Sequence, residues 1–155
     1  MNNKNTQQFG FKYNAIIRRI DRATGDIIDE ERIHNIVVND GLQRVAKRLF
    51  SNTEDFFDYI AIGTDNTSAI ASDVALGSEV TREQATVSYE ADYKSKFEKV
   101  FTFGSGESYT ITEAGIFDDA TASGSTMFNR LVFTGKSVDA DTSLSITITI
   151  TVGRV

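Results

Sequence analysis

Apolar and hydroxyl side chains alternate without interruption over residues 143–152, whose sequence is SLSITITITV. Leucine, isoleucine and valine occupy the even positions, and serine or threonine occupies the odd positions. A period of two residues is that of a β-strand with one buried face, whereas a helical period of 3.6 residues would scatter the isoleucines. Burying five such side chains contributes roughly 8–15 kcal/mol, at about 1.5–3 kcal/mol each. A face of that size needs a second layer, so we expect this strand well inside one sheet of a two-layer β fold.

Other alternating or apolar segments predict the remaining strands. We expect a β-hairpin from residues 9–20 and 27–38 around a turn that contains Gly25, since glycine tolerates the positive φ of hairpin turns. The small polar residues 64–77 predict a long surface loop with a helical turn over residues 73–76, and ordered loops of this length are unusual unless functional. Further strands are expected at residues 57–63, 81–90, 93–103, 109–117 and 126–134, and residues 135–142 lead into the terminal strand.

The period changes to that of a helix after residues 39–41 (NDG). Apolar residues at positions 42, 45, 46, 49 and 50 share one helical face, and basic or polar residues take the opposite face. Asp40 is placed to cap the N-terminus, with Gln43 at the capping-box position. We expect an amphipathic helix over residues 40–51 that packs on the sheet. Binding of this basic helix to a membrane surface is the alternative.

These elements together predict a mainly β protein, a two-layer antiparallel β-sandwich with one amphipathic α-helix and a long loop. The 155-residue chain suits a single domain, which we place at residues 9–155, after a flexible polar N-terminal arm at residues 1–8. The chain contains neither cysteine nor proline, and no apolar run approaches 18 residues. Disulfides and thiolate metal sites are therefore excluded, and no membrane-spanning helix is expected.

The net charge of −6 combines a basic first third with an acidic remainder. Residues 1–50 carry nine Lys/Arg against six Asp/Glu, a balance of +3, and residues 51–155 carry seven against sixteen, a balance of −9. This asymmetry can dock copies of the chain to each other or to an acidic neighbour, whereas ordinary solvated charge is the alternative. Bulk acidity argues against nucleic acid as a partner. The predicted partner interface comprises Lys4, Lys12, Arg18, Arg19 and Arg22.

No sequence motif identifies an active site. His34 is the only histidine, and a zinc site needs further histidine or cysteine ligands. Residues 139–143 place oxygen atoms on alternate residues as calcium loops do, but they lack the central glycine and the closing glutamate. We expect no catalytic activity, cofactor or metal. A hydrolase with a carboxylate pair in a cleft stays open as an alternative, although nothing marks a particular pair.

One charged residue lies in an apolar segment. Glu113 belongs to residues 111–117 (ITEAGIF), and a buried carboxylate needs a partner. Arg82, close to Glu79, is the predicted partner because guanidinium binds a carboxylate through two hydrogen bonds. Gly115 suggests a close backbone approach or a bulge. We expect Glu79, Arg82, Glu113 and Gly115 to form a structural clamp that holds the long loop.

Several segments in their order along the chain resemble structural proteins of tailed-bacteriophage virions. The segments are residues 39–42 (NDGL), 59–64 (YIAIGT), 75–82 (ALGSEVTR), 111–117 (ITEAGIF) and the closing alternating strand. The resemblance covers residues 36–155 and is to tail-fibre and collar proteins and to small accessory or capsid-decorating β-sandwich proteins. It implies a non-enzymatic, trimeric or hexameric virion subunit that is made in the host cytoplasm and binds tail, collar or capsid proteins.

A carbohydrate-binding module is the alternative from a different class. Such a module would stack sugars on Tyr59, Tyr89, Tyr93 or Tyr109, and it would contact glycans of the host surface. The absence of tryptophan counts against this hypothesis.

Overall fold

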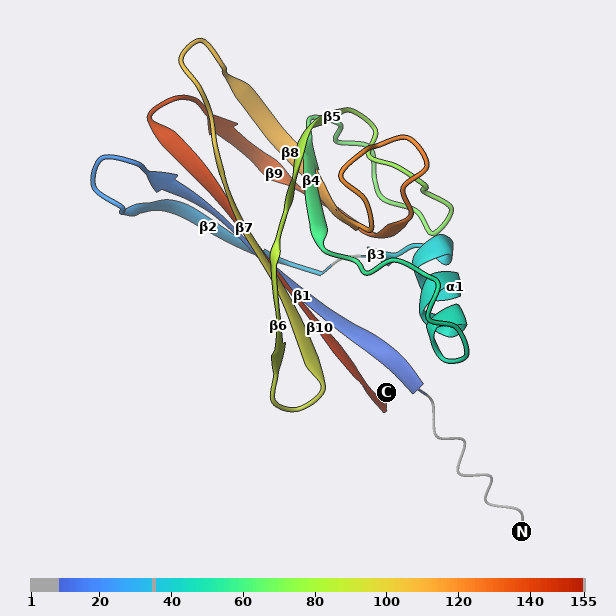
Figure 1. The fold of residues 1–155 in the computed structure, drawn as a ribbon. Coiled ribbons are helices and arrows are strands. Elements are labelled where there is room, and N and C mark those ends of the chain that lie inside the picture. Colours follow the sequence, from blue (N-terminus) through green and yellow to red (C-terminus); the bar gives the residue numbers. More distant parts are fainter. Residues whose placement is uncertain (1–8, 35, 155) are drawn as a thin grey trace.

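The computed structural model describes residues 9–34 and 36–154. These residues form two antiparallel sheets of five strands each, packed as a β-sandwich, with one α-helix at one end (Figure 1). The predicted fold class is therefore confirmed. The predicted N-terminal arm at residues 1–8 lies outside the described residues.

The first sheet has the strand order β2-β1-β10-β7-β6, and the second sheet has the order β3-β9-β8-β4-β5. Every pairing within the two sheets is antiparallel. The strands of the first sheet are β1 (Phe9–Asp21), β2 (Ile27–Ile33), β6 (Thr86–Glu90), β7 (Lys94–Thr102) and β10 (Thr142–Arg154). Those of the second sheet are β3 (Ile36–Val37), β4 (Tyr59–Gly63), β5 (Glu79–Gln84), β8 (Tyr109–Phe117) and β9 (Met127–Val138), and the helix α1 is Asn39–Arg48.

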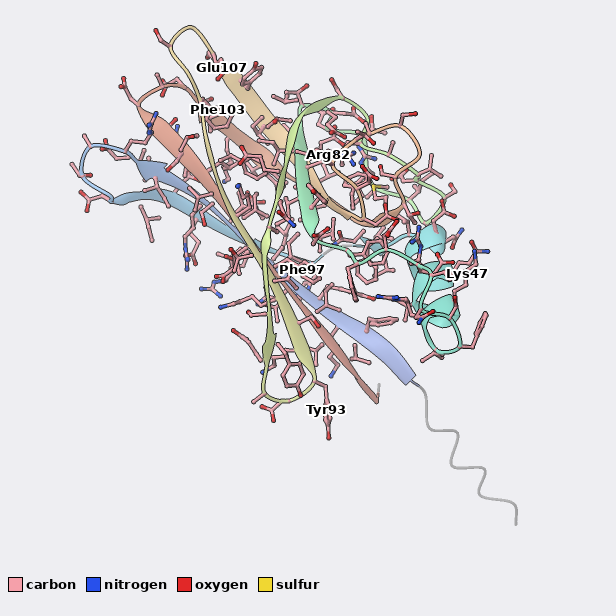
Figure 2. All side chains as sticks on the ribbon, viewed as in Figure 1. Lys47, Arg82, Tyr93, Phe97, Phe103 and Glu107 are labelled. Atoms are coloured by element: carbon pink, nitrogen blue, oxygen red, sulfur yellow. The ribbon has the colours of Figure 1, made fainter. Side chains whose placement is uncertain are left out.

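The terminal alternating segment forms β10, the central strand of the first sheet. Leu144, Ile146 and Ile148 are completely buried in the core between the sheets. Phe97 of the neighbouring strand β7 belongs to the same core (Figure 2). The threonines on the opposite face of β10 are half-buried. The prediction that this strand lies inside a sheet with its apolar side covered is confirmed.

Two segments that were predicted as single strands divide between the sheets. Residues 81–90 lie in β5 and β6, which belong to different sheets and are separated by Ala85. Residues 27–38 likewise divide into β2 in the first sheet and β3 in the second. An alternating pattern indicates an extended backbone but does not specify which strand it pairs with, so the pattern could not reveal these crossings.

The helix α1 differs from its prediction at both ends. Its N-cap residue is Val38, which has no side-chain capping hydrogen bond, so Asp40 is not the cap. The helix ends at Arg48, and Leu49 and Phe50 are 86% and 82% exposed. The buried residue of the helix is Gly41, where an added β-carbon would lie 2.8 Å from the Cα atom of Phe128. The helix therefore meets β9 through a close backbone approach.

Replacing Gly41 with alanine is expected to destabilise the protein, although alanine normally favours a helix over glycine by about 1 kcal/mol. The new methyl group would overlap backbone atoms of Phe128, which cannot move aside as a flexible side chain could. We expect a loss of about 1–3 kcal/mol in the free energy of unfolding, measured by urea denaturation. Gln43→Ala, at an exposed position of the same helix, is the matched control and should cause no loss. Equal effects of the two substitutions would contradict the close contact.

The outer side of the second sheet carries a further layer of loops. Two loops, residues 64–78 and residues 118–126, lie at the same end of the molecule as α1 (Figure 1). Leu76 from the long loop packs with Ala61 of β4 and Phe117 of β8 in a small second core. None of the helices in the described ranges has the length and hydrophobicity needed to cross a membrane.

Candidate functional site

Glu113 on β8 is the centre of a buried polar cluster on the outer side of the second sheet. Its side chain is completely buried. The carboxylate accepts hydrogen bonds from the backbone N–H groups of Asp65 at 3.2 Å, Gly77 at 3.0 Å and Ser78 at 2.8 Å. These donors come from both ends of the long loop. One buried side chain thus fastens both ends of the loop to the sheet.

Arg130 on the adjacent strand β9 supplies the positive charge of this cluster. Its Nε and Nη2 atoms lie 3.0 Å and 2.9 Å from the same carboxylate oxygen of Glu113. The guanidinium also binds Asp65 at 2.9 Å and Asp73 at 3.0 Å, and it is only 4% exposed. Burial opposes the charge on Arg130, but hydrogen bonds to Asp73 and Glu113 outweigh this effect and raise its pKa above the ordinary value. One guanidinium therefore holds three carboxylates and the middle of the loop.

The predicted pairing of Arg82 with Glu113 is wrong. The Nε and Nη2 atoms of Arg82 instead donate to the two carboxylate oxygens of Glu79, each at 2.7 Å. The reason is the strand order, in which β9 is next to β8 whereas β5 is separated from β8 by β4. Sequence reasoning overlooked Arg130. A single arginine in the apolar segment 127–133 (MFNRLVF) has the same unusual setting as Glu113 and could have identified it.

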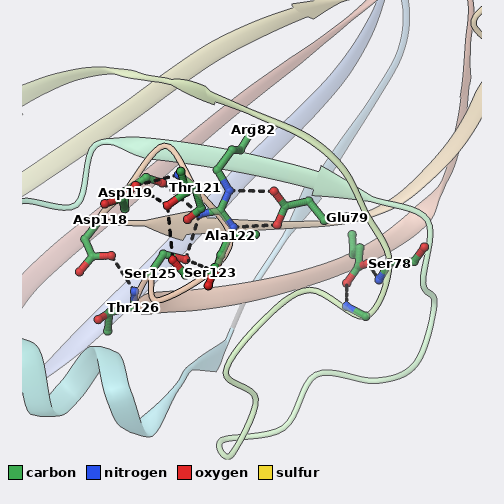
Figure 3. Close-up of polar contacts among 12 residues, drawn as sticks. Ser78, Glu79, Arg82, Asp118, Asp119, Thr121, Ala122, Ser123, Ser125 and Thr126 are labelled. Atoms are coloured by element: carbon green, nitrogen blue, oxygen red, sulfur yellow. Dashed lines mark hydrogen bonds and ion pairs between the residues drawn. The ribbon is translucent and has the colours of Figure 1, made fainter.

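Arg82 braces a different loop from the one predicted (Figure 3). Its Nη1 atom donates to the carbonyl oxygens of Asp119 at 3.0 Å and Thr121 at 3.1 Å, and to the Ser125 hydroxyl at 3.0 Å. The guanidinium carbon also lies 4.0 Å from the ring centroid of Phe117. Glu79 and Arg82 therefore form a clamp on residues 118–126, separate from the Glu113 cluster.

Glycines provide the space that the Glu113 cluster needs. A β-carbon at Gly115 would lie 2.7 Å from the carbonyl oxygen of Asn129, in keeping with the predicted close approach. A β-carbon at Gly63 would overlap the Glu113 carboxylate, and one at Gly77 would overlap the Asp65 carboxylate. Alanine at any of these positions would therefore disturb the sheet or the anchored loop.

A third arginine, Arg44 of α1, joins the helix to the neighbouring segments. It binds Glu54 at 2.8 Å, and it also contacts the carboxylate of Asp118 and the hydroxyl of Thr126. Its side chain is 14% exposed. Arg130, Arg82 and Arg44 thus brace the long loop, the loop of residues 118–126 and the segment after α1. We refer to these three groups of contacts as the arginine braces.

The arginines of the predicted partner interface make contacts within the protein. Arg18 pairs with Glu30 at 2.7 Å, and Arg19 pairs with Asp29 at 3.0 Å, which fastens β1 to β2. Arg22 donates to the carbonyl oxygens of Phe103 and Ala140. Lys12 is exposed on β1, and Lys4 lies outside the described residues. A role of these five residues toward a partner stays a prediction.

A surface hollow of about 340 Å³ is lined mainly by acidic side chains. Its lining includes Asp55, Asp58, Asp118 and Asp119 together with Phe56 and Tyr59. Asp58 accepts a hydrogen bond from Gln84, and Asp118 binds Arg44. Within residues 9–34 and 36–154 no group of three or more His, Cys, Asp or Glu side chains is arranged to hold a metal ion. The single His34 contacts the carbonyl oxygen of Tyr13 at 3.0 Å through its Nδ1 atom.

Comparison of the chain with protein-family models, with curated proteins and with solved structures finds no match.

Acid is expected to weaken the anchor of the long loop. Hydrogen bonds from the hydroxyl and backbone N–H of Thr67, together with Arg130, hold the pKa of Asp65 below its ordinary value. A carboxylate with a lowered pKa in the folded state stabilises the fold above its ordinary pKa of about 3.9 and loses this contribution as the pH falls further. We therefore expect the melting temperature to fall as the pH is lowered below about 4. Asp65→Asn should be less stable at neutral pH and should show a smaller fall, and an identical pH profile would contradict this role.

Proposed function

We propose that this chain is a non-enzymatic structural protein of a tailed-bacteriophage virion, a small tail or collar adaptor or a capsid-decorating subunit that binds neighbouring virion proteins. The arginine braces are the observation that carries the proposal. Glu113 and Arg130, the most buried charged groups among the described residues, pair with each other, and Glu113 holds the backbone of the long loop in place. Charge used in this way stiffens a surface, as a subunit that must fit fixed neighbours requires.

The segments that carry the resemblance pack against one another. Residues 59–64 contain β4, residues 75–82 contain the end of the long loop and most of β5, and residues 111–117 lie in β8. Glu113 in the last of these segments accepts hydrogen bonds from Gly77 and Ser78 in the second. Residues 39–42 open α1, where Gly41 meets β9. This packing supports interpreting the segments as one structural unit.

Exposed apolar side chains beside the braces supply a contact surface. Leu49, Phe50 and Phe56, which we call the apolar tip, follow α1 and are 76–86% exposed. The guanidinium carbon of Arg48 lies 4.3 Å from the ring centroid of Phe56, which restrains that ring. Grouped apolar side chains on the surface are typical of sites that bind another protein. The apolar tip is therefore the part of the surface that we assign to a neighbouring virion protein.

Incorporation into particles tests the proposal. In the phage whose genome encodes this chain, the wild-type protein should co-purify with particles through a density gradient. A variant with serine at the three positions of the apolar tip should be depleted from particles while its melting temperature stays close to that of the wild type. Ile27→Ser with Ile28→Ser, at exposed apolar positions in the β1–β2 hairpin, is the matched control and should be incorporated normally.

Further variants separate the parts of the proposal. Deletion of residues 1–8 should reduce incorporation and leave the fold intact. Absence of the wild-type chain from purified particles would overturn the proposal, and normal incorporation of the serine variant would remove the assignment of the apolar tip.

Portal and capsid genes beside the coding sequence would favour a place in the head, and baseplate genes would favour the tail.

Carbohydrate binding is the second candidate because two tyrosines are strongly exposed on one hairpin. Tyr89 and Tyr93 are 73% and 71% exposed, and Tyr93 projects from the end of the β6–β7 hairpin (Figure 2). Tyr59 and Tyr109 are half-buried, and the ring centroid of Tyr109 lies 6.0 Å from that of Phe103. A glycan array tests this candidate. Binding that is lost in Tyr93→Ala would support it, and an array without binding would remove it.

A further inference from the structure

The four edge strands of the sandwich differ in how well they are protected against pairing with another chain. Natural sheets block such pairing with charged side chains or with very short edge strands. Within the described residues β3 has only two residues, and β2 and β5 carry several charges. In contrast, β6 (TVSYE) contains one charged residue among five. The charged side chains are Asp29, Glu30, Glu31 and Arg32 in β2, Glu79, Arg82 and Glu83 in β5, and Glu90 in β6.

β6 also presents apolar side chains beside an open edge. Its hydrogen-bonded neighbour is β7, and the strand forms the margin of the first sheet (Figure 1). Val87 and Tyr89 lie on the same face of β6 and are 45% and 73% exposed. On the open side, alternate backbone N–H and C=O groups point away from the sheet. A second strand would satisfy these groups and cover both side chains.

We propose that β6 is the site at which two copies of this chain pair, antiparallel and edge to edge, about a two-fold axis at Ser88. The inference rests on the proposed function, because the resemblance behind that proposal implies a trimeric or hexameric subunit, and it names a strand through which copies of the chain would associate. This register pairs all five residues of β6 with those of the second copy. Val87 of each copy faces Tyr89 of the other, and Ser88 faces Ser88.

The residue pairs of this register are favourable. A β-branched side chain opposite an aromatic one stabilises an antiparallel sheet. Thr86 faces Glu90, so no two like charges are opposite each other, whereas an axis at Glu90 would place two carboxylates together. The same patch on both copies is self-complementary, which is what a two-fold interface requires.

The size of this contact determines how strongly two copies associate, and its symmetry determines which assemblies it can build. A five-residue strand pairing buries less than the roughly 1,000 Å² of a stable interface, so the contact is weak in dilute solution and is favoured where many copies are held close together. A two-fold contact builds a dimer or a hexamer with D3 symmetry, and it is absent from a cyclic trimer. Of the two assemblies that the resemblance implies, the contact therefore selects the hexamer.

Cysteine trapping tests the pairing, and the chain contains no native cysteine that could interfere. Ser88→Cys places two thiols opposite each other with their β-carbons roughly 5 Å apart, close enough for a disulfide after a small adjustment. Ser105→Cys, at an exposed turn position, is the control. Under mild oxidation of the full chain, we expect Ser88→Cys to form disulfide dimers at least about tenfold faster than Ser105→Cys. Equal rates would overturn the proposal.

Two charge variants in the Ser88→Cys background test the register. Val87→Lys with Tyr89→Lys places lysine opposite lysine and should slow cross-linking about tenfold, because facing like charges are unfavourable. Val87→Lys with Tyr89→Glu removes the same apolar pair but places lysine opposite glutamate, and it should cross-link within about threefold of Ser88→Cys alone. Circular dichroism checks that both variants are folded. Equal rates of the two variants would overturn the register.

The outcomes in particles separate this inference from the proposed function. Cross-linking of Ser88→Cys to a different virion protein bearing an engineered cysteine, without homodimers, would assign the edge to that neighbour and overturn pairing between copies. A chain that is present in particles but is not trapped as a homodimer retains the proposed function and loses the inference. A chain that is trapped as a homodimer but is absent from particles retains the inference of pairing through β6 and loses the proposed function.

Discussion

Replacing Arg130 with methionine is expected to lower the free energy of unfolding by about 3–5 kcal/mol, because the substitution leaves the buried carboxylate of Glu113 without a counter-charge. The same change releases Asp73 in the middle of the long loop. Urea denaturation measures the loss of stability. Brief digestion with proteinase K should also cleave within residues 64–78, a segment that the braces otherwise hold against the sheet.

Two further variants establish that the charge of Arg130 is responsible. Arg18→Met breaks the ion pair with Glu30, which is much more exposed, and should cost far less stability. Combining Arg130→Met with Glu113→Gln removes both buried charges and should recover part of the loss, since an uncharged amide is cheaper to bury than an unpaired carboxylate. If Arg130→Met were no more destabilising than Arg18→Met, Glu113 would not depend on Arg130.

Replacing Ile148 with alanine should cost about 2–5 kcal/mol, because this side chain is completely buried at the centre of the first sheet and the surrounding core cannot close the resulting cavity. Urea denaturation again provides the measurement. Thr147→Ala, at the adjacent position on the opposite, half-buried face of β10, is the matched control. The control should lose much less stability. Similar losses at both positions would show that the two faces of β10 are not distinct.

The sequence predicted β10 well because its pattern has a period of two over ten residues and permits only one extended arrangement. The same reasoning failed for the end of α1, where Leu49 and Phe50 continue the helical period but are exposed beyond its last residue. A period describes the spacing of side chains along the chain. The period does not specify whether another part of the protein covers those side chains.

The candidate site was predictable in part. An acidic residue in the apolar segment of β8 correctly indicated that Glu113 requires a partner, and Gly115 correctly indicated a close backbone approach. The identity of the partner depends on the order of strands across the sheet, which places Arg130 beside Glu113 and Arg82 two strands away. That order results from pairing between distant parts of the chain and is not encoded in any single segment.

The pairing of β1 with β10 has a consequence for how the protein is made. These strands pair along their whole length, from Phe9 opposite Arg154 to Asp21 opposite Thr142. During translation β1 emerges from the ribosome first among the described strands and must wait for β10, which emerges last. Such a high contact order slows folding. Nascent chains that terminate before residue 142 lack the strand that joins β1 to β7, so we expect incomplete products to be open to proteases.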